Sequence, residues 1–156
     1  MHSERLRTYI IILLLFFVEL ILFDKLRVSG VRPEILLIVT VFFGFHFGTV
    51  RGMEIGALSG ILKDIFSITG FGINAFSFLL IGFLSGYLKD KLFKDNFVTQ
   101  FLFSCFSVYL VWAIFIVLGQ ASFSPTAAVL YKGLYTGILA PFLFIVLTKI
   151  FGPKET

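Results

Sequence analysis

Four ionisable side chains lie within stretches of the chain that are otherwise almost entirely apolar. They are Glu19, Lys63, Asp64 and Lys132. Each costs about 2.5–3.5 kcal/mol at the centre of a bilayer, so such residues are expected to pair with one another or to serve a site. Two carboxylates and two ammonium groups can neutralise one another. We therefore expect an intramembrane polar pocket made of these four residues, which receives a ligand or a partner's helix. The alternatives are an internal ion-pair cluster and side chains that extend to the membrane interface.

The sequence lacks the spacing patterns of the common catalytic and metal sites. An intramembrane serine protease usually carries Gly-x-Ser-Gly, whereas this chain has Ala57-Leu58-Ser59-Gly60, and His46 is expected near the opposite face of the membrane. Cys105 is the single cysteine, and no phosphate-binding loop is present. We therefore expect a protein that is not an enzyme and that holds no cofactor and no metal.

The composition is that of an integral membrane protein. Hydrophobic residues make up 58% of the 156 residues and charged residues 14%, against about 25% charged residues in a soluble domain. Six helices of about 20 residues each would use most of the chain. We therefore expect residues 1–156 to form a single all-α membrane domain, a compact bundle of about six transmembrane helices. The net charge of +4 suits anionic lipid headgroups, and nothing in its pattern favours nucleic acid.

Hydrophobic runs and turn residues predict where the six helices lie. The expected spans are 8–23, 33–47, 52–68, 73–88, 97–118 and 126–150. Pro33 suits the first turn of the second span, where its missing N–H has no partner to lose. The junction at residues 48–51 is the least regular boundary, and a broken or re-entrant stretch there is the alternative.

The distribution of lysine and arginine predicts the orientation. With six spans, one side holds Arg5, Arg7, Arg51, Lys89, Lys91, Lys94, Lys149 and Lys154, and the other side holds Lys25, Arg27 and Arg32. Because the more basic side is normally cytoplasmic, both termini are expected in the cytoplasm. The three cations of the first outer loop are an exception to the rule.

Glycines four residues apart predict close helix packing. Gly48, Gly52, Gly56 and Gly60 extend a series that begins at Gly44, and Gly133 and Gly137 form a similar pair near the C-terminus. Such spacing lets helix backbones approach closely in a membrane. We expect these glycines to form a helix-packing or partner interface, with the third, fourth and sixth helices making the close approaches. Asp64 takes the next step of the series, so its carboxylate is expected to point inward.

These residues also carry a resemblance to a known family. The stretch from Arg32-Pro33-Glu34 to Leu37, the glycine series ending in Gly60-Ile61-Leu62-Lys63-Asp64, Gly70, Ser124-Pro125 and the segment from Gly133 to Pro141 resemble the MreD family of rod shape-determining proteins. The chain departs from the family pattern at Glu34, where Asp or Asn is common, and at Lys63, where an apolar residue is usual.

The resemblance implies a non-catalytic scaffold in the bacterial cytoplasmic membrane. Such a protein would bind MreC and couple MreB filaments to the enzymes of lateral peptidoglycan synthesis, as part of the cell-elongation complex. An alternative of another class is a substrate-capture subunit of an energy-coupling-factor vitamin transporter, a fold that the MreD family resembles. In that case Lys63, Asp64 and Lys132 would hold a polar vitamin. Few other polar side chains are available for such a pocket, which favours the scaffold.

Overall fold

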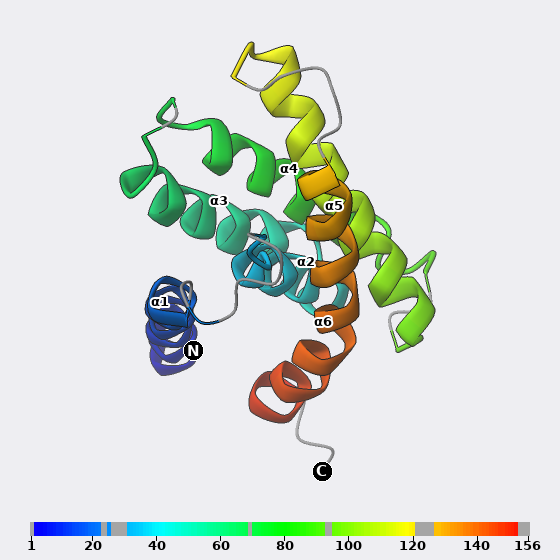
Figure 1. Ribbon diagram of the computed structural model, residues 1–156. Coiled ribbons are helices and arrows are strands. Elements are labelled where there is room, and N and C mark those ends of the chain that lie inside the picture. The colour runs from blue at the N-terminus through cyan, green and yellow to red at the C-terminus, as the bar shows by residue number, and fades with distance from the viewer. Residues whose placement is uncertain are drawn as a thin grey trace.

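The computed structural model describes residues 2–22, 25, 31–68, 70–92, 95–120 and 127–152. Within these residues the chain is all-helical, as expected (Figure 1). The six helices are α1 (His2–Leu22), α2 (Ile35–Phe47), α3 (Thr49–Ile65), α4 (Ile73–Tyr87), α5 (Phe97–Val117) and α6 (Ala127–Phe151). Some of the expected span ends, loop charges and family motifs lie outside the described residues, at positions 23, 27, 94, 124–126 and 154.

Helix α2 forms the centre of the molecule and contacts each of the other five helices (Figure 1). Its residues are buried without interruption from Ile35 to Phe45. A helix that is apolar on every side is stable in lipid or inside a protein, and here the neighbouring helices cover it. The remaining helices therefore organise around α2, and the polar groups at its N-terminal end must find partners inside the protein.

A single residue, Gly48, separates α2 from α3. Its φ of 90° is a conformation that favours glycine. A Cβ at Gly48 would meet nothing within 4 Å, although the Gly48 backbone lies against Gly86. Gly48 therefore allows the break between the two helices, within the junction expected at residues 48–51, and its backbone also packs against α4. The third helix begins at Thr49 instead of Gly52.

Helices α3 and α4 form the most extensively packed pair. A Cβ added at Gly52 would overlap the Gly82 carbonyl oxygen, and one added at Gly82 would overlap that of Gly52. Gly56 and Gly60 lie equally close to the α4 backbone, at Phe78 and at residues 74–75. Backbone contact of this kind is possible only without side chains. These glycines are thus occupied inside the protein and are not available to a partner.

Helices α5 and α6 form a second pair. Gly133 lies against the Tyr109 ring, and Gly137 lies against Phe101 and Cys105, whose thiol donates a hydrogen bond to the Gly133 carbonyl oxygen at 3.1 Å. The close approaches expected of a trio of helices are instead divided between α3–α4 and α5–α6. Figure 1 shows the second pair, from green-yellow to red, crossing beside α2.

Two of the described helices, α5 and α6, are long and apolar enough to cross a membrane by length and composition. Helices α2 and α4 are apolar but have 13 and 15 residues, which corresponds to about 20 Å and about 22 Å at 1.5 Å per residue. A hydrocarbon core is about 30 Å thick. The arrangement with six complete spans therefore remains a prediction.

Candidate functional site

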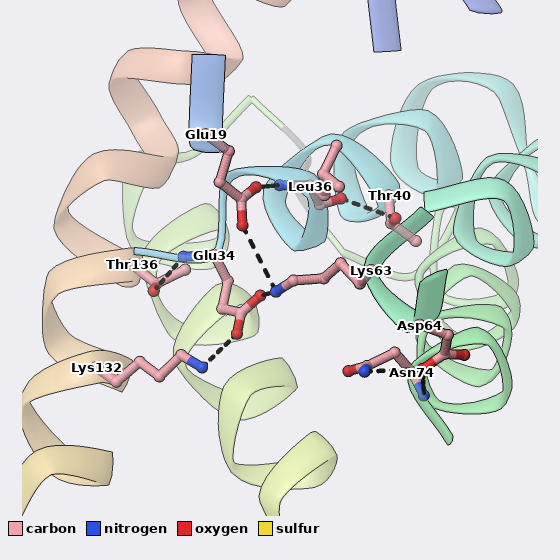
Figure 2. A network of polar contacts seen from close by, with 9 residues as sticks. All are labelled: Glu19, Glu34, Leu36, Thr40, Lys63, Asp64, Asn74, Lys132 and Thr136. Carbon is pink, nitrogen blue, oxygen red and sulfur yellow. Dashed lines mark hydrogen bonds and ion pairs between the residues drawn. The ribbon is translucent and has the colours of Figure 1, made fainter. Parts of the chain in front are cut away.

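Glu34 is the centre of a buried ion network at the N-terminal end of α2 (Figure 2). Its carboxylate forms ion pairs with Lys63 of α3 and Lys132 of α6. Its backbone N–H, which precedes the helix, donates a hydrogen bond to Thr136 Oγ1 at 3.2 Å. Glu34 itself is 8% exposed. One residue before α2 thus connects the central helix to two others.

Glu19 of α1 completes the network. One carboxylate oxygen lies 3.6 Å from Lys63 Nζ, and the other accepts a hydrogen bond from the Leu36 backbone N–H at 3.1 Å. The first N–H groups of a helix lack partners within that helix, and a negative charge there is favourable. Glu19 therefore satisfies the start of α2 and neutralises Lys63 with the same carboxylate.

Asp64 does not belong to this network, which corrects the expectation of one pocket containing all four charges. Its carboxylate accepts hydrogen bonds from the backbone N–H groups of Gly72, Asn74 and Ala75 at 2.9–3.2 Å, and from Asn74 Nδ2 at 2.9 Å. Consecutive helix residues differ by about 100° in direction. Lys63 therefore points toward Glu34, while Asp64 points to the N-terminus of α4 and caps it (Figure 2).

The network joins four segments and balances its charges. Glu19 and Glu34 oppose Lys63 and Lys132, and all four side chains except Lys132, at 36%, are at most 17% exposed. A buried ion is tolerated when its partner and further hydrogen bonds replace water. Lys63 Nζ also lies 5.4 Å from the centre of the Phe78 ring, a cation–π contact. The arrangement is typical of a device that holds helices in a fixed order.

Two cavities lie beside the network. One, of about 200 Å³, is lined by Glu34, Lys132 and Trp112 among others, and the second, of about 300 Å³, is lined by Glu19 and Lys63 among others. Both have mostly apolar walls, and neither is lined by Asp64. Within the described part of the chain, no group of three or more His, Cys, Asp or Glu side chains could hold a metal ion.

A second, smaller polar cluster joins α1 to the other end of α3. The Tyr9 hydroxyl donates a hydrogen bond to Glu54, and Arg51 Nη1 donates to Glu54 Oε2 at 3.1 Å. The sequence predicts that Glu54, beside Arg51, is a solvated charge at the membrane interface. The contact with Tyr9 adds that Glu54 also fixes the position of α1.

Sequence reasoning missed Glu34, Thr136, Asn74 and Tyr9 as members of these clusters. Glu34 drew notice only as a departure from a family pattern. A partial signal was present, because Glu34 follows Pro33 at a helix start, where a negative charge is favourable. The Asp64 cap also had a signal, since a turn with two glycines and then a helix follows it.

Comparison with known proteins gives one match. A family model described as rod shape-determining protein MreD matches residues 4–151. Curated proteins and solved structures gave no match. The matched range includes every described helix almost completely, together with the ion network and the glycines between α3 and α4. The chain therefore belongs to the MreD family of rod shape-determining proteins.

Proposed function

We propose that this membrane protein is a non-catalytic scaffold of the bacterial cell-elongation complex. It binds MreC directly and, through it, couples MreB filaments to lateral peptidoglycan synthesis. Family membership supports involvement in rod-shape determination and association with the cell-shape machinery. The partners and the coupling are the proposal itself.

The observation that supports the proposal is that the buried charges pair with one another and with the backbone of the same protein. Glu34 is paired with Lys63 and Lys132, and Glu19 with Lys63 and the start of α2. A solute could bind these side chains only after their ion pairs were broken. Side chains that hold four helices together are what a scaffold requires, because a partner then meets a surface of fixed shape.

The vitamin-capture alternative is less well supported by this geometry. It assigned Lys63, Asp64 and Lys132 to one ligand. Asp64 instead accepts four hydrogen bonds at the start of α4, and both lysines contact Glu34. A capture site needs several polar groups that converge on a cavity and are available to the ligand.

The proposal is tested by purifying the tagged full-length protein from membranes after mild solubilisation and identifying what accompanies it by mass spectrometry. We expect MreC in near-stoichiometric amount, accompanied by enzymes of wall synthesis. An unrelated multi-span protein with the same tag, expressed at the same level, serves as the control. Recovery of a coupling-factor ATPase with a bound vitamin, or equal recovery of MreC with the control, would refute the proposal.

A further inference from the structure

An apolar groove lies between α1 and α3, with a polar contact at each end. One end is the Tyr9–Glu54 hydrogen bond, and the other is the Glu19–Lys63 ion pair. The contact later in α1 is also the one later in α3, so the two helices run in the same direction. The cavity between these contacts has a volume of about 580 Å³ and is lined by Tyr9, Ile10, Ile12, Leu13, Glu54, Leu58 and Leu62.

The two polar contacts bound the length of the groove. Ten residues separate Tyr9 from Glu19, which corresponds to a length of about 15 Å. An acyl chain can lie along an apolar groove of this length, and so can a partner's helix. The choice between them therefore rests on the charges at the ends of the groove.

The charges at the Tyr9 end specify the headgroup. Arg51 and Arg5 both act electrostatically on Glu54, so two cations face one carboxylate at this end of the groove. Arg5 is exposed on α1, and the Arg51 side chain is 29% exposed. Basic side chains at a membrane surface attract anionic lipids. The surplus positive charge at this mouth complements a phosphate-bearing, negatively charged headgroup.

We propose that this groove binds one anionic phospholipid, with an acyl chain between α1 and α3 and the headgroup phosphate at Arg5 and Arg51. Helix α1 packs only against α2 and α3 among the described helices, so the acyl chain would fill space that protein leaves open. The lipid thereby stabilises the position of α1. This binding site goes beyond the scaffold function, which requires no lipid at this place.

The test uses purified full-length protein without partners and measures retained lipid by native mass spectrometry. Phosphatidylglycerol and phosphatidylcholine are offered in equal amounts in mixed micelles. We expect one phosphatidylglycerol per chain to be retained in preference. Leu58→Trp, which fills the groove, should abolish retention, whereas Leu102→Trp on the exposed face of α5 should leave it unchanged.

A second variant keeps the test valid if Leu58→Trp fails to fold. Arg5→Gln changes an exposed residue of α1 and should lower the preference for phosphatidylglycerol about fivefold, the factor corresponding to one basic residue near an anionic surface. Equal retention of the two lipids by the wild-type protein, or undiminished retention in a folded Leu58→Trp variant, would overturn the proposal. In a separate experiment with the partners present, cross-linking of a partner's helix to position 58 would also overturn it. Since no partner is present in the lipid measurement, its failure leaves the scaffold proposal untouched.

Discussion

At the scale of single residues, the two adjacent charges of α3 have separate tasks. Lys63 joins Glu34 and Glu19, while Asp64 caps α4. The sequence identified both as expensive in a membrane, since that depends only on residue type and apolar surroundings. It did not reveal their partners. Those depend on which helix starts lie near which carboxylates, and that information is absent from local spacing.

Asp64→Asn should destabilise the protein more than Glu54→Gln. The asparagine keeps one acceptor oxygen but loses the charge that interacts with the α4 N-terminus, where several N–H groups now converge on the carboxylate. Loss of such a cap costs about 1–2 kcal/mol. Glu54 lies in a partly exposed cluster, where an ion pair contributes less. Unfolding temperatures in one detergent, with wild-type protein alongside, measure the difference.

Asp64→Glu is the matched control for that comparison. It keeps the charge but moves the carboxylate outward by one methylene, so we expect a stability between those of the wild type and Asp64→Asn. Equal unfolding temperatures for Asp64→Asn and Glu54→Gln would show that the α4 cap contributes little.

At the scale of helices, small-residue spacing predicted close contact, including that between the third and fourth helices, but it did not predict that the sixth helix packs against the fifth. Gly52, Gly56 and Gly60 do lie where a Cβ would overlap a neighbouring backbone. The neighbour is α4, the next helix along the chain, whereas Gly133 and Gly137 face α5. A row of glycines at this spacing predicts that another helix packs closely against it. It does not indicate which helix, because several rows in the chain have the same spacing.

Gly82→Ala should destabilise the α3–α4 pair, since the added methyl group would overlap the Gly52 carbonyl group. Backbone cannot move aside as a side chain does, and overpacking of this kind costs about 1–3 kcal/mol. Gly133→Ala is the matched control, because its methyl group would meet the end of the Tyr109 side chain, which can rotate. Fluorescence-detected size exclusion after graded heating should show the earlier loss of Gly82→Ala. An equal loss in both variants would refute the role assigned to the backbone contact.

At the scale of the whole molecule, composition indicated a helical membrane protein, while the course of the chain was only partly predictable. The break at Gly48 falls within the junction expected at residues 48–51. The complete burial of α2 could not be deduced, because an apolar run looks the same in sequence whether lipid or protein surrounds it. The parallel direction of α1 and α3, seen in the Glu54–Tyr9 and Glu19–Lys63 contacts, agrees with an even number of crossings between their starts.

The predicted orientation can be tested with single cysteines. In a Cys105→Ser background, which removes the buried native thiol, Lys25→Cys and Lys89→Cys are expected on opposite sides of the membrane. A membrane-impermeant thiol reagent applied to intact cells should label position 25, and position 89 should be labelled only after permeabilisation. Labelling of both positions in intact cells, or the reverse order, would contradict two cytoplasmic termini.

The central claim is that the buried charges hold four helices together instead of binding a solute. The most direct test is the unfolding temperature of purified, solute-free Glu34→Gln, with the exposed Glu4→Gln as the control. Removing one partner of a buried ion network costs about 3–5 kcal/mol, so Glu34→Gln should unfold at a clearly lower temperature than wild type, while Glu4→Gln should not. An unchanged or higher unfolding temperature for Glu34→Gln would contradict the claim. A carboxylate that serves to bind a ligand is expected to lower the stability of the ligand-free protein, so its removal would not destabilise that protein.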